Sequence, residues 1–163
     1  IDCCITSPPY YGLRDYVGAN IQSKLTQTER DSLTYWNAKI DAGDTTHATR
    51  LGRGRNLAPA YLYDKKYVPI LAERLTQGNA DLNQLIWDDM EKIKFNCAPQ
   101  LKNFMRPVLI IQGKQDIIKP ETAERSRQAF KNSKVVYLEN CGHYGWLDVE
   151  GEYFDQINSF LRG

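Results

Sequence analysis

The stretch Arg106-Pro-Val-Leu-Ile-Ile-Gln-Gly-Lys-Gln-Asp116 decides the fold, because an uninterrupted apolar run leads into a glycine turn and then a carboxylate. A second apolar run, Lys134-Val-Val-Tyr-Leu-Glu-Asn-Cys-Gly142, leads into His143. The segment between them, from about 120 to 130, opens with proline and glutamate and reads as a helix. Two apolar runs joined through a helix are typical of a parallel βαβ unit. The sequence therefore predicts an α/β fold.

Asp116 and His143 are the candidate catalytic residues of this unit. The carboxyl ends of parallel strands meet at one edge of a sheet, where α/β proteins place their chemistry. A carboxylate behind an imidazole fixes its tautomer and stabilises the imidazolium that forms when the ring takes a proton. The alternative is that Asp116 caps a helix or loop and His143 is a surface histidine. The other histidine, His47, lies in a polar helical stretch.

Residues 1–6 read as a further short buried strand, which Ser7-Pro8-Pro9 ends because proline cannot donate to a ladder. With strands over 107–112 and 134–138 it would complete a three-stranded parallel sheet. Helical spacing predicts further helices over 26–40, 45–62, 68–75, 80–94 and 151–161. Thr28, three residues before Asp31, resembles a capping arrangement for the first of these.

Two of these helices carry a one-sided apolar pattern that predicts a buried face. The apolar residues are Leu82, Leu85, Ile86, Met90 and Ile93 in the helix 80–94, and Phe154, Ile157, Phe160 and Leu161 in the closing helix.

The stretch from Pro107 to Pro120, with Gly-x-x-Asp116, and the stretch from Cys141 to Asp148, with Gly-His143-x-x-Trp146, resemble the C-terminal third of an α/β-hydrolase. The proline iminopeptidase-like members are the most similar. The helical region from about Gly18 onward resembles their cap. The resemblance implies a partial α/β-hydrolase fold: a short parallel sheet with flanking helices and a helical cap. It divides the chain into a strand and loop (1–17), a cap (18–104) and a C-terminal βαβα part (105–163).

The resemblance also implies a function. Such enzymes are serine hydrolases that cleave esters or the peptide bond after an N-terminal residue, without a cofactor, and Asp116 and His143 would be the acid and the histidine of the triad. The substrate would be a small-molecule ester or peptide. We assign substrate contacts to Tyr61, Trp87 and Trp146, although helix packing is an alternative explanation for such aromatic residues.

The nucleophile of this family is missing from the chain, since no Gly-x-Ser-x-Gly occurs in it. Ser7 is no substitute, because two prolines follow it. We expect the nucleophile and the first strands upstream of Ile1, and no activity from the chain alone. The alternative is a non-catalytic binding or dimerisation fragment, whose partner would be a second copy or the missing N-terminal half.

Residues 2–16, Asp-Cys-Cys-Ile-Thr-Ser-Pro-Pro-Tyr-Tyr-Gly-Leu-Arg-Asp-Tyr, separately resemble the Ser-Pro-Pro-Tyr motif of DNA methyltransferases that modify adenine N6 or cytosine N4. In that family the motif holds a flipped base. The chain has no Phe-x-Gly-x-Gly loop for S-adenosylmethionine. The alternative is therefore a remnant of an amino-methyltransferase that lacks its cofactor loop.

Composition bounds the partners. The chain has 163 residues with 21 basic and 20 acidic side chains, so we do not expect a nucleic-acid surface. Its four cysteines, Cys3, Cys4, Cys97 and Cys141, lack metal-ligand spacing and read as free thiols of a reducing compartment. No apolar run is long enough for a membrane helix. We expect a soluble, cytoplasmic protein without a metal site.

Overall fold

The computed structural model describes residues 21–163, with the side chains of residues 80 and 81 left aside. Two predictions, the strand over 1–6 and the methyltransferase-like motif over 2–16, lie outside the described residues. The described elements, in chain order, are α1 (Ile21–Lys24), α2 (Gln27–Asp41), α3 (His47–Leu57), η2 (Ala58–Ala60), η3 (Lys65–Tyr67), α4 (Val68–Leu75), α5 (Ala80–Lys92), α6 (Ala98–Leu101), β1 (Val108–Gly113), α7 (Pro120–Ala129), β2 (Ser133–Leu138), α8 (Gly145–Asp148) and α9 (Glu150–Arg162).

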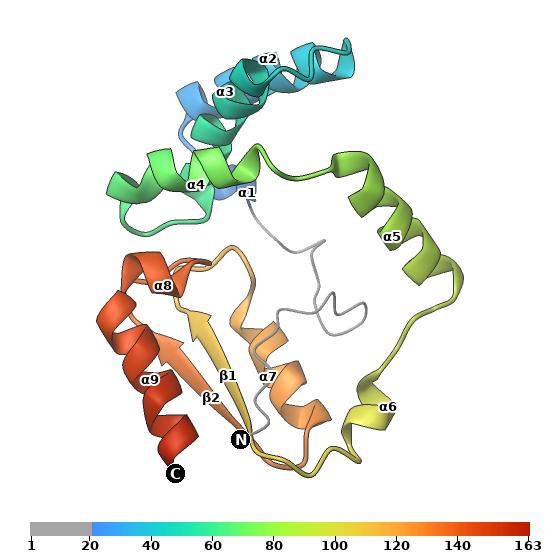
Figure 1. The fold of residues 1–163 in the computed structure, drawn as a ribbon, viewed down its shortest axis with the longest axis vertical. Coiled ribbons are helices and arrows are strands. Elements are labelled where there is room, and N and C mark those ends of the chain that lie inside the picture. The colour runs from blue at the N-terminus through green and yellow to red at the C-terminus, as the bar shows by residue number, and fades with distance from the viewer. Residues whose placement is uncertain (1–20) are drawn as a thin grey trace.

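The prediction of a parallel βαβ unit is confirmed. β1 and β2 pair in parallel, with Val108 opposite Ser133 and Gly113 opposite Leu138. The described sheet has these two strands, so the expected third strand stays untested. Helix α7 connects the two strands and packs against both of them, and α9 also contacts both. Figure 1 shows α7 and α9 on opposite sides of the strands, as a parallel sheet requires to bury its two faces.

Residues 21–101 form the helical elements from α1 to α6 and no strand. The predicted cap is likewise all helical. The boundaries at 17/18 and 104/105 stay predictions. Helix α3 packs against both α2 and α4. It ends at Leu57, earlier than expected, because Pro59 follows within the 3-10 turn η2.

Two buried apolar clusters lie between these helices and the loops that follow the strands. The first joins α1, α2 and α3 to the loop after β1, through Leu25, Leu33, Leu57, Ala60, Ile117 and Ile118. The second joins η2 and α4 to the loop after β2, through Ala58, Leu62, Leu71 and Ala72, with Tyr144 and Leu147 packed against them. Tyr61 packs against both clusters. The largest share of the described core is thus where the cap meets the site edge of the sheet.

The predicted N-cap residue of α2, Thr28, was wrong by two positions. Thr26, and not Thr28, is the N-cap of α2: its hydroxyl accepts the N–H of Glu29 at 3.2 Å, and the Glu29 carboxylate accepts the N–H of Thr26 at 2.7 Å. This reciprocal pair is a capping box. The sequence Thr26-x-x-Glu29 carries the signal as well as Thr28-x-x-Asp31 does, and the shorter aspartate lacks the reach of glutamate.

The predicted apolar faces are only partly buried. In α5, Met90 is buried, but Leu82, Leu85, Ile86 and Ile93 are 45–65% exposed. In α9, Ile157 and Phe160 are partly buried, whereas Phe154 and Leu161 are exposed. No other described element packs extensively against α5, which lies across the molecule from α9 (Figure 1).

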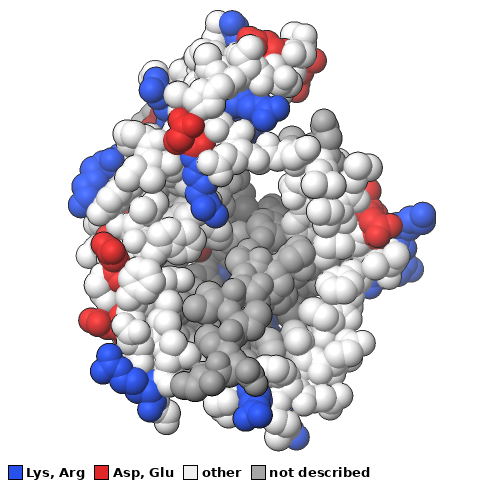
Figure 2. Space-filling view, in the orientation of Figure 1, with Lys and Arg blue, Asp and Glu red and all other residues white. Residues whose placement is uncertain are grey.

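Charged side chains of both signs are spread around the visible face in Figure 2, and neither sign gathers into one patch there. Among residues 21–163 there is no helix both long and apolar enough to span a bilayer.

We predict that Thr26→Ala lowers the free energy of unfolding by about 1 kcal/mol, because the N–H of Glu29 in the first turn loses its acceptor, the Thr26 hydroxyl. The matched control is Thr28→Ala, an exposed threonine inside the same turn, for which we expect a change within about 0.5 kcal/mol. Urea unfolding followed by circular dichroism measures both. Equal losses for the two variants would contradict the assignment of Thr26 as the cap.

Candidate active site

Asp116 and His143 meet at the carboxyl edge of the sheet. Asp116 lies in the loop after β1 and His143 in the loop after β2. The ring nitrogen Nδ1 of His143 lies 3.0 Å from Oδ1 and 3.1 Å from Oδ2 of Asp116. The aspartate side chain is 8% exposed and the histidine 24%. The predicted contact between the two side chains is confirmed, and their catalytic role stays a prediction.

The geometry fixes which ring nitrogen carries the proton. An ionised carboxylate can only accept hydrogen bonds, so the Nδ1–H of His143 is the donor. Oδ1 of Asp116 also accepts the N–H of Ile118 at 2.9 Å, which holds the carboxylate in place. The second nitrogen, Nε2, then carries a lone pair and has no hydrogen-bond partner among the described residues. A partly exposed, oriented imidazole of this kind can act as a general base.

The backbone of His143 is held by the cap. Its N–H donates to the carbonyl oxygen of Tyr61 at 2.7 Å. The preceding Gly142 allows this approach, because a Cβ there would lie 2.3 Å from the same oxygen. A Cβ on Gly113 would lie 2.2 Å from the carbonyl oxygens of Cys141 and Gly142. Both glycines are therefore needed for close packing of the backbone around the histidine.

Gln115 ties the two site loops together. Its backbone N–H donates to the carbonyl of Cys141 at 2.9 Å, and its side-chain Oε1 accepts the N–H of Cys141 at 3.0 Å. Asp148, at the end of α8, also accepts a backbone N–H of this loop, that of Gly142, at 2.7 Å. Sequence reasoning missed both residues. Nothing in their spacing marks them, since each acts on backbone groups whose positions only the fold reveals.

The three residues assigned to substrate contacts lie in different places. Tyr61 is beside the pair, with its ring 5.9 Å from that of His143. Trp146 is on α8, 39% exposed, and its ring is 5.0 Å from that of Tyr144, the neighbour of the histidine. Trp87 is on α5, which Figure 1 shows across the molecule from α8. The structure thus brings Tyr61 to the pair and does not bring Trp87 there. Trp146 is separated from the His143 ring by the ring of Tyr144.

Comparison with known proteins supports the same fold. Two solved structures align with a TM-score of 0.52 and 18% identity: a 2-hydroxy-6-oxo-6-phenylhexa-2,4-dienoate hydrolase from a Rhodococcus species, and MGS-M2, an α/β-hydrolase enzyme from a deep-sea metagenome of the Medee basin. The alignments cover 75% and 85% of this chain, and 46% and 52% of those proteins. The chain has a partial α/β-hydrolase fold.

Curated sequences point to the same superfamily. A pimeloyl-[acyl-carrier protein] methyl ester esterase from Nitrosospira multiformis is 33% identical over 64 residues, and Lipase 1 from Psychrobacter immobilis is 26% identical over 106 residues. These matches cover 39% and 63% of this chain. They span only 24% of the esterase and 32% of the lipase. No protein-family model matches the chain.

A hollow of about 680 Å³ lies between α4 and α8. Burial raises the pKa of the Tyr144 phenol at its wall, and Arg74 beside the phenol opposes that rise. Tyr144 lines the hollow, and its ring centroid lies 5.4 Å from that of His143. The lining combines apolar and polar side chains: Pro69, Ile70, Leu71, Glu73, Arg74, Gln77, Tyr144, Trp146 and Leu147.

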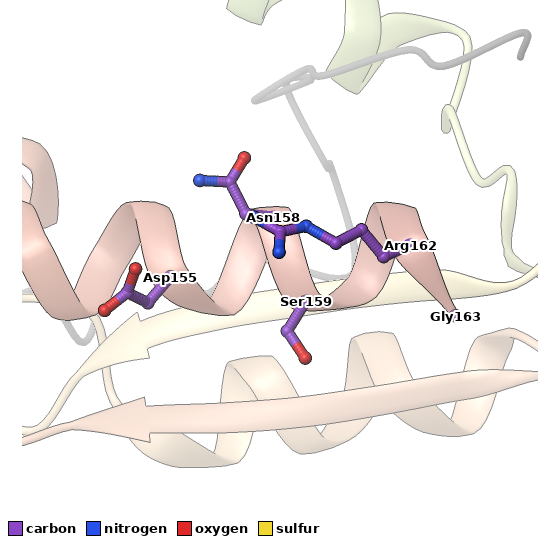
Figure 3. Close-up of a pocket in the computed structure, with 5 residues that line it drawn as sticks. All are labelled: Asp155, Asn158, Ser159, Arg162 and Gly163. Carbon is purple, nitrogen blue, oxygen red and sulfur yellow. The ribbon is translucent and has the colours of Figure 1, made fainter.

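A second hollow has no connection with the pair. Figure 3 shows its lining residues along α9 from its middle to its end and at the following glycine: Asp155, Asn158, Ser159, Arg162 and Gly163. The C-terminal end of α9 lies toward the end of the strands opposite the site loops (Figure 1). Within residues 21–163, no three metal-binding side chains are grouped as ligands.

Cys141 is the thiol nearest to His143 in the sequence, but its state makes it a poor nucleophile. Burial, with a smaller contribution from the Asp148 carboxylate, raises the pKa of its thiol to about 12. Its side chain is buried, and Sγ donates to the carbonyl of Gly142 at 3.4 Å. A thiol that stays protonated near neutral pH does not attack a carbonyl carbon.

We predict that Cys141 resists iodoacetamide in the folded protein at pH 8, because only about one thiol in ten thousand is ionised four pH units below its pKa. Cys97, a free and half-buried cysteine, is the internal control and reacts faster. Peptide mapping by mass spectrometry after timed labelling separates the two. In denaturant both sites become fully modified. Folded-state labelling of Cys141 at the rate of Cys97 would be the contrary result.

Proposed function

We propose that this chain supplies the acid and the histidine of a serine hydrolase that cleaves esters or the peptide bond after an N-terminal residue. The observation that carries the proposal is the contact of 3.0 Å between Nδ1 of His143 and Asp116, which leaves Nε2 oriented as a base. In a triad of this kind, the histidine takes the proton of the nucleophile and returns it to the leaving group.

Two lines support an ester as the substrate. The printed names of the curated relatives are those of an esterase and a lipase. The hollow beside Tyr144 has apolar walls from α4 and α8, which suit an acyl chain. The peptide alternative rests on the proline iminopeptidase-like motifs around Asp116 and His143. We propose Tyr61 and Trp146 as substrate contacts, and Trp87 as a cap residue that would reach a substrate only if α5 moved.

The nucleophile is proposed to come from a Gly-x-Ser-x-Gly elbow that this sequence does not contain. Cys141, two residues before His143, has a thiol whose raised pKa keeps it protonated near neutral pH. The hydroxyls of Ser126, on α7, and Ser133, at the start of β2, donate to the carbonyls of Thr122 and Arg127. Without a nucleophile the covalent route is closed, and the chain alone is expected to be inactive.

We predict that the purified chain hydrolyses p-nitrophenyl butyrate and prolyl-β-naphthylamide no faster than buffer does. In a triad, loss of the nucleophile removes about six orders of magnitude from kcat. The assay compares wild type, His143→Ala and His47→Ala at equal concentration. A rate above buffer that His143→Ala abolishes and His47→Ala retains would show that the nucleophile lies within the chain.

The positive test grafts residues 21–163 behind the N-terminal half of a hydrolase that carries its own serine elbow. We expect ester hydrolysis from the graft, and a loss of at least about a thousandfold on His143→Ala or Asp116→Ala. His47→Ala is the matched control, because His47 is exposed and bonded to Glu73 on the cap. The proposal would be overturned by a graft that is folded, as its melting transition shows, and whose activity is unchanged by His143→Ala.

The second candidate function, a dimerisation module, is favoured by the apolar face of α5. Three large side chains of this helix, Leu82, Leu85 and Ile86, are exposed, as is Ile93 at its C-cap. Exposed apolar side chains that recur on one face of a helix are typical of interaction surfaces. Among residues 21–163, no strand pairs with the edge of β1 that faces away from β2, and such an edge is a further candidate surface. The methyltransferase alternative concerns residues outside the described part and stays a prediction.

We predict that the chain self-associates at micromolar concentration and that Leu85→Glu weakens the association, because a charge on the apolar face opposes its burial. Asn83→Glu is the matched control on the exposed surface of the same helix. Sedimentation velocity across a concentration series gives the result. A wild-type protein that remains monomeric throughout would exclude the dimerisation module.

A further inference from the structure

The carboxylate of Asp148 holds together two segments that are far apart in the sequence. Its Oδ2 accepts the N–H of Gly142 at 2.7 Å. Its two oxygens also accept the N–H of Tyr63 at 3.1 and 3.0 Å, and Oδ1 accepts the N–H of Asp64 at 2.9 Å. Gly142 precedes the catalytic histidine, whereas Tyr63 and Asp64 belong to the cap turn between η2 and η3.

We propose that Asp148 is a positioning residue that fixes His143 by tying its loop to the cap turn. This inference rests on the proposed function, because it assigns a role toward the histidine of that site. No described hydrogen bond joins Asp148 to the His143 ring, so its action runs through the backbone of Gly142.

The bonds join the site at two adjacent points. Asp148 fixes the N–H of Gly142, and the next N–H along the chain, that of His143, is fixed by the carbonyl of Tyr61 at 2.7 Å. Both partners of the cap, Tyr61 and Tyr63, belong to one short turn. Two consecutive peptide groups before the imidazole are therefore anchored to the same cap turn, which limits how far the ring can move from Asp116.

The side chain of Asp148 does more than end its own helix. Its backbone N–H stays within α8, donating to the carbonyl of Tyr144 at 3.1 Å. Its carboxylate instead bonds three N–H groups outside that helix. Bonds from N–H groups to a carboxylate are charge-assisted and stronger than neutral ones. Removing the acceptor leaves partly buried N–H groups unsatisfied, which is the costly way to lose a hydrogen bond.

The experiment uses the whole chain and does not depend on catalysis. Nitrogen-15 NMR of the histidine rings reports the tautomer, and amide exchange reports the anchored N–H groups. Wild type is expected to show His143 protonated at Nδ1 and unprotonated at Nε2. In Asp148→Asn, which keeps the shape of the side chain, the two ring nitrogens are expected to average between tautomers. Exchange at Tyr63, Asp64 and Gly142 is expected to rise about tenfold.

Asp155→Asn is the matched control, because Asp155 is exposed on α9 (Figure 3) and is expected to leave both signals unchanged. His47 supplies an internal reference ring in every sample. Asp116→Asn gives the signature of a histidine without its carboxylate. Melting curves ensure that each spectrum is taken on folded protein. A general loss of stability lowers the melting temperature without changing the tautomer of His143 at temperatures well below it.

The outcomes separate the two claims. If wild type lacks the Nδ1-protonated signature, the Asp116–His143 pair and the proposed function fail. If wild type shows it and Asp148→Asn retains it, with unchanged exchange at Gly142, the positioning role of Asp148 fails while the proposed function stands. Loss of the signature in Asp148→Asn and not in Asp155→Asn supports the inference. Asp148→Ala, which removes every acceptor oxygen, is expected to give the same loss more strongly.

Discussion

The apolar contact between the helical cap and the loops that follow β1 and β2 is the constraint on which the rest of the structure depends. Two parallel strands with α7 and α9 leave much of their own surface half-exposed, whereas the side chains just beyond the strand ends are buried against the cap. Ile117 and Ile118, which are 6% and 5% exposed, directly follow Asp116. Burial of these neighbours fixes the loop that presents the carboxylate.

Around this contact, the polar part of the site is built largely from backbone groups. Gln115, Tyr61 and Asp148 each act through a peptide N–H or carbonyl of the histidine loop. Glycines at 113 and 142 let these backbone segments approach one another closely, because no Cβ stands between them. The imidazole is thereby oriented at both ends, by Asp116 at Nδ1 and by the cap at its own peptide group. Such support from outside the reacting groups is what holds a catalytic geometry within tenths of an ångström.

The sequence predicted those features that depend on local pattern. The strands around Val108 and Val135, the helix between them and the contact of Asp116 with His143 all follow from apolar runs that end in chemistry-bearing loops. The predicted N-cap residue of α2 was wrong because two overlapping threonine–acid pairs give the same local signal. The apolar face containing Leu85 remained exposed because periodicity shows that a face is apolar but not what covers it. Asp148 escaped detection because its partners are peptide groups, which every residue carries.

The bond from His143 to the carbonyl of Tyr61 separates two roles at one position. Every amino acid offers a carbonyl, so the anchor for the histidine does not depend on the identity of residue 61. The phenol ring, which packs against both apolar clusters and faces the imidazole edge-on, does depend on it. Natural or designed variation at this position is therefore free to reshape the wall next to the imidazole while the imidazole stays in place. Under the proposed function, a changed side chain at position 61 would alter the surroundings of the imidazole, while the backbone anchor of His143 stays the same.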